Sequence, residues 1–327
     1  MIAKNDYKRL SAKECAARLL EIKNPIVFIH VKPDGDAVGS AAALCEIFRQ
    51  LGENPYIISA DKIPERLKFI LDNTGTAVAE KTDEYTAVAI DVASPAQLGA
   101  LYNPKCAPAL MIDHHALGEQ FADGYIAPDA SSSAEVLYDV ATELFEMGKI
   151  KFTKELAFAL FAAISSDTGC FAFSNASAKT HICAARLMEL GIDTAYINNK
   201  LFYSKSEEQI KAEGFIASKI KTAYGKKVAY ATLTLAEKEA LGLCTEHFET
   251  AIDVVRSLCG VEIAFVVKEE KEGKFKASLR STGADVASVA GEFGGGGHIR
   301  AAGCTVSAKN ITEAADVILL KIDGKVE

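Results

Sequence analysis

The chain has 327 residues, of which 49% are hydrophobic and 24% charged, a composition that is typical of a folded globular protein and argues against long disordered regions. Its formal net charge of −8 argues against an extended footprint on duplex nucleic acid, because a surface that binds many phosphates is normally basic. A small phosphorylated ligand is compatible with this charge if bound divalent metals supply positive charge locally.

The chain carries neither a secretory nor a membrane-spanning signal. The N-terminal residues MIAKNDYKRL lack the apolar segment of a signal peptide, and the longest apolar run, 156–164, is far shorter than the ~20 residues that cross a bilayer. We therefore expect a cytoplasmic protein with no membrane partner. The eight cysteines include no C-x-x-C pair and lie mostly in apolar surroundings, which favours reduced core residues over disulfides or a zinc site.

The first part of the chain alternates strand and helix patterns. Short apolar runs predict buried strands at 25–30, 86–90 and 109–112, and helical spacing occurs at 37–51, 133–147, 154–164 and 180–190. Strands that alternate with helices predict an α/β domain over 1–194 with a doubly wound, mostly parallel sheet.

The pattern changes in the last third of the chain. Residues 195–222 are more polar and predict a helical connector. After it come an alternating strand at 228–234, a hairpin formed by 261–267 and 275–280, and helices at 284–293 and 311–322. We expect a smaller α+β domain over 223–327, with the active-site cleft between the two domains.

Potential metal ligands follow the end of every predicted strand in the first domain. In open α/β sheets, ligands bind outside the carboxyl ends of the strands, so these side chains are expected to converge. A further aspartate follows the helix at 154–164. In chain order the set is His30, Asp34, Asp36, Asp91, Asp113, His114, His115 and Asp167.

Each motif alone has an ordinary structural explanation. The PDGD segment that holds Asp34 and Asp36 is a common turn, and a single aspartate such as Asp91 often caps a helix. We favour a functional site because a purely structural explanation must account for every motif at the same sheet edge. The carboxylates of Asp34 and Asp36 can diverge toward two ions that Asp91 bridges. Oxygen ligands with one or two imidazoles suit Mn²⁺, and Mg²⁺ less well.

Five motifs, in this order, resemble the DHH phosphoesterase superfamily with its DHH-associated C-terminal domain. They are IHVKPDGDAVGS, the strand that ends in Asp91, MIDHHAL, SSDTGCF and FGGGGHIRAAG. The resemblance covers nearly the whole chain, and the two-domain layout is most similar to bacterial nanoRNases that also act on 3′-phosphoadenosine 5′-phosphate (pAp). RecJ-type exonucleases and membrane-bound cyclic-dinucleotide phosphodiesterases carry further domains, and family II pyrophosphatases have a different C-terminal domain.

The resemblance implies two ligand sets that share Asp91. The first Mn²⁺ would be held by His30, Asp34 and Asp91, and the second by Asp36, Asp91, His114 and Asp167. Asp113 would orient a neighbouring group, and His115 would contact the scissile phosphate. A water activated by the two cations would be the nucleophile, so Cys170 is expected to be a packing residue.

The resemblance also implies that the second domain grips the far phosphate or the nucleotide. The residues at the matching positions are Arg280, Ser281, Gly295, Gly296, Gly297 and His298. The glycine stretch is expected to present backbone N–H groups to an anionic ligand. On this hypothesis, Gly295→Val raises KM more than it unfolds the domain. The nearby cluster of Lys219, Lys221, Lys226 and Lys227 is more typical of a solvated face than of a binding site.

Two positions depart from the family pattern. Many relatives have an arginine in the segment after the bridging aspartate, where this chain has Gln97, and an asparagine soon after the DHH triplet, where this chain has ALGEQ. Both positions lie near the predicted site, so we expect them to affect substrate preference more than the reaction.

The main functional hypothesis is a Mn²⁺-dependent phosphohydrolase that cleaves short oligoribonucleotides to mononucleotides and also dephosphorylates pAp. Its expected partners are short RNA or small phosphorylated nucleotides, and a homodimer is compatible with the sequence. Two alternatives stay open: a phosphodiesterase for linear or cyclic dinucleotide signals, and a catalytically silent nucleotide-binding module.

Overall fold

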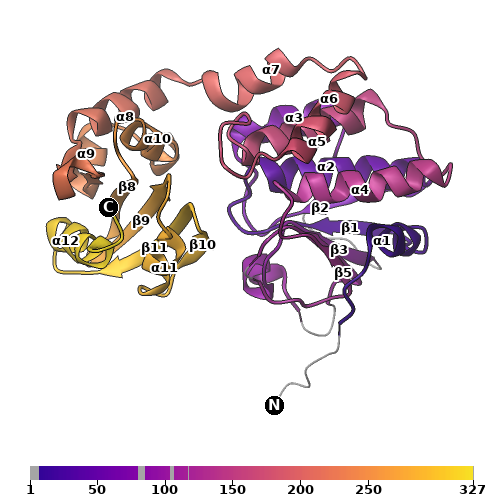
Figure 1. Cartoon of the computed structure of the whole chain (residues 1–327), viewed down its shortest axis with the longest axis horizontal. Helices are drawn as coiled ribbons and strands as arrows, with labels where there is room; N and C mark the ends of the chain where they lie inside the picture. The colour runs from indigo at the N-terminus through magenta and orange to yellow at the C-terminus, as the bar shows by residue number, and fades with distance from the viewer. Residues whose placement is uncertain (1–6, 80–84, 104–106, 117, 327) are drawn as a thin grey trace. The chain divides into compact units, whose positions relative to one another are not determined.

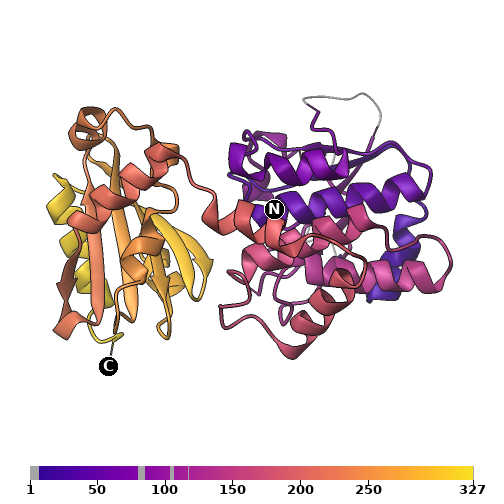
Figure 2. The ribbon, with the colours of Figure 1, turned by 90° about the horizontal axis from the view of Figure 1, so that it is seen from above.

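A computed structural model describes residues 7–79, 85–103, 107–116 and 118–326, and the chain divides into two compact units, Met1–Ser204 and Lys205–Glu327. Each unit is built from one continuous stretch of chain, as the colour gradient shows (Figures 1 and 2). The segment predicted as a connector, 195–222, is therefore shared between the two units. Among the helices in the described ranges, none is long and apolar enough to span a membrane.

The first unit contains a five-stranded sheet in the order β2-β1-β3-β4-β5, with every neighbouring pair parallel. This confirms the predicted parallel α/β sheet. The chain reverses direction of winding between β1 and β3, which is where ligands bind in sheets of this order. The strands are β1 Pro25–Phe28, β2 Tyr56–Ile58, β3 Thr86–Ile90, β4 Leu110–Asp113 and β5 Gly124–Ile126.

The helices of the first unit gather mainly on one side of the sheet, where α2 to α6 lie together (Figure 1). Val27 and Val88 pack against these helices, whereas Ile26 and Phe28 face a smaller cluster on the opposite side. The α-helices are α1 Ala12–Leu19, α2 Gly35–Gln50, α3 Lys68–Thr74, α4 Ser133–Glu146, α5 Lys154–Asp167, α6 Ala178–Met188 and α7 Thr194–Asn198. Shorter helical turns are η1 Glu65–Leu67, η2 Pro95–Leu101 and η4 Asn199–Tyr203.

The second unit contains a six-stranded mixed sheet in the order β10-β11-β9-β8-β7-β6, in which only the β7–β8 pair is parallel. This confirms the second α+β domain. The strands are β6 Lys221–Ala223, β7 Val228–Leu233, β8 Ile263–Lys271, β9 Lys274–Ser281, β10 Gly296–His298 and β11 Ala301–Ser307.

Helices pack on both faces of the second sheet. One cluster of buried side chains contains residues of α11 and α12, and the other contains residues of α8 and α10. The helical segments are α8 Glu207–Ser218, η5 Tyr224–Lys226, α9 Leu235–Ala240, η6 Thr245–Phe248, α10 Ala251–Arg256, α11 Val286–Gly291 and α12 Ile311–Ile322.

The glycine-rich stretch is a strand pair rather than a loop. Gly296 pairs with Gly303 and His298 with Ala301, so β10 and β11 form a hairpin at the edge of the sheet. Glycine disfavours strands, but the long neighbour β9 supplies backbone partners along all of β11.

Seven of the eight cysteines lie in the described ranges and all seven are free, while Cys106 lies outside the described residues. Four of the seven are buried, as expected for core residues. Cys170 is half-buried, and Cys244 and Cys259 are exposed.

Candidate active site

The end of β1 and the start of α2 place three of the predicted ligands. His30 Nδ1 donates to the Val31 carbonyl at 2.7 Å, and Nε2, the other ring nitrogen, faces Asp34 and Asp91. Asp34 is the N-cap of α2, because its Oδ1 accepts from the backbone N–H of Asp36 and Ala37. Asp34 therefore caps the helix, as in an ordinary turn. Its carboxylate also points toward the His30 ring.

Asp91 lies at the centre of the site. It directly follows β3, is only 2% exposed, and adopts a left-handed backbone with φ 58°. Its Oδ2 lies 3.5 Å from His30 Nε2, and its Oδ1 lies 3.7 Å from His114 Nε2. The two oxygens of one carboxylate thus face two different groups of side chains.

The DHH triplet contributes from the end of β4. His114 Nδ1 faces the Ala130 carbonyl at 3.3 Å, so its Nε2 is directed at the carboxylates. Asp113 is buried and accepts a 2.7 Å hydrogen bond from His115 Nδ1. Asp113 therefore fixes the orientation of the His115 ring through this hydrogen bond.

Asp36 and Asp167 complete the cluster from two helices. Asp36 Oδ2 lies 3.9 Å and Asp167 Oδ2 3.8 Å from the same atom, His114 Nε2. Asp167 is the last residue of α5, and the Asn175 side chain donates to its backbone carbonyl at 3.1 Å. All eight side chains predicted for this site therefore lie at the carboxyl edge of the sheet.

Potential ligand atoms converge in three groups that contain Asp91, of which two are candidates for holding a metal ion. His30, Asp34 and Asp91 form one group, and Asp36, Asp91 and His114 form another, each with its atoms within 4.8 Å of one another. Asp167 joins the second group through its approach to His114. A third group, Asp91, Asp113 and His115, contains the Asp113–His115 hydrogen bond and so has fewer free lone pairs.

The electrostatics of the cluster fit bound cations. Burial, together with the nearby charges of Asp91 and Asp167, raises the pKa of Asp36 well above its ordinary value. Burial and the charges of Asp34 and Asp91 do the same to the pKa of Asp167. Carboxylates this close cannot all ionise unaided, and divalent cations would remove that cost. Carboxylate oxygens combined with two imidazoles are donors that suit a divalent metal ion.

The buried residues that hold these carboxylates were not predicted from the sequence. The Ser133 N–H donates to Asp36 Oδ2 at 2.7 Å, and its hydroxyl donates to Asp91 Oδ1 at 3.0 Å. Ser40 donates to Asp36 Oδ1 at 2.8 Å. In a sequence, a serine-rich segment before a helix is typical of an ordinary N-cap. Ser133 meets Asp36, which lies 97 residues earlier in the chain, only because of the order of the strands in the sheet.

Gln97 stabilises the loop after Asp91. Its side-chain oxygen accepts from the Ala93 N–H at 2.6 Å, and its carbonyl accepts from the Val31 N–H at 2.7 Å. The Gln97 side chain is thus hydrogen-bonded to the backbone of its own loop in this structure.

In the second unit, the strand register aligns Arg280 and His298. His298 pairs with Ala301, which also pairs with Arg280, and residues directly opposite in antiparallel strands share a face. The next row on that face is Gly296, Gly303 and Ser278. The floor between the two cationic or polar side chains is therefore made of alanine and glycine. Burial lowers the pKa of the Arg280 guanidinium.

Ser281 does not join this row. It follows Arg280, so its side chain lies on the opposite face of the sheet, where its hydroxyl donates to the Ala284 carbonyl. Arg300 donates to the same carbonyl at 2.9 Å. Both residues stabilise the turn after β9, so the structure gives Ser281 a structural contact in place of the predicted substrate contact.

The expectation for Gly295→Val is also wrong in its structural premise. A Cβ at Gly295 would lie 2.2 Å from the Gly303 carbonyl oxygen and 2.6 Å from the Cys304 Cβ. A side chain there disrupts β11, whereas a Cβ at Gly296 meets no heavy atom of the described residues within 4 Å. Gly296 is therefore the better position to probe ligand binding.

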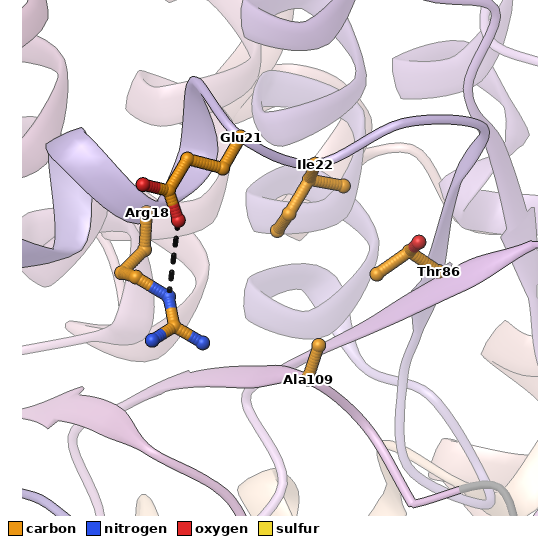
Figure 3. Close-up of a pocket in the computed structure, with 5 residues that line it drawn as sticks. All are labelled: Arg18, Glu21, Ile22, Thr86 and Ala109. Atoms are coloured by element: carbon orange, nitrogen blue, oxygen red, sulfur yellow. Dashed lines mark ion pairs between the residues drawn. The ribbon is translucent and has the colours of Figure 1, made fainter.

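A hollow of about 200 Å³ lies at the other end of the first sheet (Figure 3). It is lined by Arg18, Glu21, Ile22, Thr86 and Ala109, and the Arg18 guanidinium lies 3.8 Å from Glu21. Thr86 begins β3, so this hollow lies at the amino ends of the strands, away from the carboxylate and imidazole cluster. We assign it no function.

Comparisons with known proteins identify the two domains of the chain. Residues 24–164 match the DHH family, N-terminal domain, and residues 225–323 match the DHHA1 domain. A Thermus thermophilus protein described as a bifunctional oligoribonuclease and PAP phosphatase NrnA is 28% identical over 306 residues, which are 92% of this chain and 90% of that protein. A Listeria monocytogenes cyclic-di-AMP phosphodiesterase, PdeA, is 26% identical over 97% of this chain but only 50% of its own length.

Among solved structures, an exopolyphosphatase-related protein from Bacteroides fragilis superposes with a TM-score of 0.86, covering 95% of both chains at 22% identity. At this identity the likeness establishes the shared fold.

Proposed function

The chain belongs to the DHH family of phosphoesterases, with a DHHA1 domain after its DHH domain, and it is a hydrolase of phosphoesters; from this premise we propose that it cleaves short oligoribonucleotides to mononucleotides with the help of Mn²⁺. The same site would remove the 3′-phosphate of pAp. The Thermus thermophilus relative, whose description names both activities, matches over nearly the full length of both chains and so supports this substrate class.

The observation that carries the proposal is the pair of ligand groups that share Asp91. His30 and Asp34 stand on the Oδ2 side of its carboxylate, and Asp36 and His114 on the Oδ1 side. In our proposal these groups, with Asp167, hold two divalent cations. When bound, the cations supply positive charge for the attacking and leaving oxygens of a phosphoryl displacement.

His115 is the side chain that we assign to the scissile phosphate. Burial lowers its pKa, but the Asp113 hydrogen bond and the negative charges of Asp113, Asp91 and Asp36 together outweigh burial and raise the pKa of His115 to about 9 in the metal-free protein. A protonated imidazole held in a fixed orientation stabilises the negative charge that accumulates on a phosphate oxygen. Asp113 acts through His115, as the group that fixes the ring.

Arg280 and His298 are the residues that we assign to the other end of the substrate. They lie in one row on a glycine- and alanine-floored face, with Arg280 half-buried and His298 exposed, and a planar guanidinium can bind a phosphate there through two hydrogen bonds. Gly296 keeps side-chain atoms away from that face, whereas Gly297 faces the other side of the sheet, where a Cβ would collide with Ala302. Because the site offers few cationic side chains and the chain carries a net charge of −8, a short substrate fits better than a long duplex.

A cyclic-dinucleotide phosphodiesterase is the second candidate, because the Listeria relative matches 97% of this chain. A panel of pApA, pAp, pGpG and cyclic di-AMP with added Mn²⁺ separates the candidates by kcat/KM. We expect the highest values for pApA and measurable phosphate release from pAp. A preference for cyclic di-AMP would favour the second candidate, and nucleotide binding without turnover would support a silent module. A cytoplasmic location and a homodimer stay predictions.

A further inference from the structure

The backbone of residues 130–134, just before and at the start of α4, holds the side chains of the second ligand group. The Ala130 carbonyl accepts from His114 Nδ1 at 3.3 Å. The Ser131 carbonyl accepts from Asn175 Nδ2 at 2.9 Å, and the same amide donates to the Asp167 carbonyl at 3.1 Å. One short segment is thus connected to two ligands that come from β4 and α5.

Ser133 contacts the two remaining members of that group. Its N–H donates to Asp36 Oδ2 at 2.7 Å, and its hydroxyl donates to Asp91 Oδ1 at 3.0 Å. Ser133 and both carboxylates are buried. Since Asp91 Oδ1 is the oxygen that faces His114, the Ser133 hydroxyl fixes the side of the shared carboxylate that belongs to the second group.

The segment is itself held in place. The buried carboxylate of Glu135 accepts from the Ser131 hydroxyl at 2.6 Å and from the Thr180 hydroxyl at 2.7 Å. The Ser132 hydroxyl caps α4 by accepting from the Glu135 N–H at 3.1 Å. The first ligand group is oriented by other means, because the Val31 carbonyl holds His30 and the N-terminus of α2 holds Asp34.

We propose that Ser133 is a positioning residue that fixes Asp36 relative to Asp91 and so sets the geometry of the second cation group. This inference rests on the proposed two-cation function. A carboxylate pair that is already fixed does not have to be ordered when the cation binds, and hydrogen bonds behind metal ligands commonly change metal affinity by roughly 10–100-fold.

The test is a calorimetric titration of the metal-free protein with Mn²⁺, comparing wild type with Ser133→Ala. We expect the variant to weaken one of the two binding steps by about tenfold or more and to leave the other within about twofold. With pApA, kcat falls at a fixed Mn²⁺ concentration while KM for the oligonucleotide stays within about twofold, because the substrate face of the second unit is unchanged.

Ser132→Ala is the matched control. It removes a buried hydroxyl one residue away that caps the helix and contacts no ligand carboxylate, so it should lower the Tm and leave both Mn²⁺ affinities unchanged. Unchanged Mn²⁺ binding in Ser133→Ala, or an equal weakening in the two serine variants, would overturn the inference. If wild type itself binds no Mn²⁺, the proposed function fails; if only the Ser133→Ala comparison fails, the proposed function stands.

Discussion

The two units differ in how they present their functional side chains. The site of the first unit is largely buried and crowded, and its aspartates and histidines are held by hydrogen bonds with backbone groups, Ser133, Asn175 and one another. The corresponding face of the second unit is open and floored with glycine and alanine around Arg280 and His298. Bond cleavage needs charges fixed in a desolvated place, whereas recognition of a flexible chain needs room for the ligand. Changes in the first unit should therefore affect kcat, and changes in the second KM.

The largest effect is expected at Asp91. Asp91→Asn keeps a residue that tolerates the left-handed backbone at φ 58°, which alanine would strain, but removes the charge shared by both ligand groups. We expect kcat/KM for pApA to fall by at least about a thousandfold, equivalent to roughly 4 kcal/mol of transition-state stabilisation. Steady-state kinetics with Mn²⁺ measure this, and circular dichroism checks the fold. If kcat/KM of the variant stays within tenfold of wild type, the proposal that the first unit carries out bond cleavage is contradicted.

Arg280→Ala should show the opposite pattern. Loss of a charged hydrogen-bond donor costs about 1.5–3 kcal/mol, so KM for pApA should rise by roughly 10–100-fold with a small change in kcat. Arg18→Ala is the control, because Arg18 lies beside the hollow at the amino ends of the first sheet. If kcat falls and KM does not change in Arg280→Ala, recognition is not the role of this side chain.

The adjacent glycines separate recognition from stability within the second unit. Gly296→Val points into space free of described atoms, on the face shared by Arg280 and His298, and should raise KM several-fold at a nearly unchanged Tm. Gly295→Val collides with the Gly303 backbone and should destabilise the unit by about 1–3 kcal/mol. Thermal melts and kinetics of both variants measure this, and a stable Gly295→Val protein would contradict the packing described for β11.

The smallest effect concerns pH and the first unit alone. The folded pKa of His115, raised to about 9, exceeds the ordinary value of about 6.5 because the Asp113 hydrogen bond and the nearby carboxylate charges together outweigh burial. In the metal-free protein, protonated His115 stabilises the folded state. This contribution to the free energy of unfolding is fully present below pH ~6.5 and is lost as the pH rises through about 9. With EDTA present, the Tm of wild type should fall more steeply over this range than that of Asp113→Asn. Equal slopes would show that the bond contributes little.

The sequence was most informative where a chemical motif directly follows a strand. Asp91 and the DHH triplet end buried strands, and parallel pairing alone brings such positions to one edge of the sheet. The order β2-β1-β3-β4-β5 then makes β1 and β3 neighbours, which places His30 beside Asp91. A local pattern was therefore enough to predict which side chains converge.

It was less informative where the structure depends on distant partners. The glycine-rich stretch forms β10 and the start of β11 because β11 pairs with both β10 and β9. No local propensity of the stretch indicates this pairing. The contact of Ser133 with Asp36 joins residues far apart in the chain, and Ser281 was misassigned because the alternation of the strand turns it away from Arg280. Strands β2 and β5 are only three residues long, too short for a periodic pattern.

The most direct test of the central claim is a crystal structure grown with Mn²⁺ and measured at the manganese absorption edge. The two ligand groups predict two anomalous peaks about 3.5–4 Å apart, one beside His30 and Asp34 and the other beside Asp36 and His114, with the Asp91 carboxylate in contact with both. A single peak, or two peaks that do not share Asp91, would contradict the account.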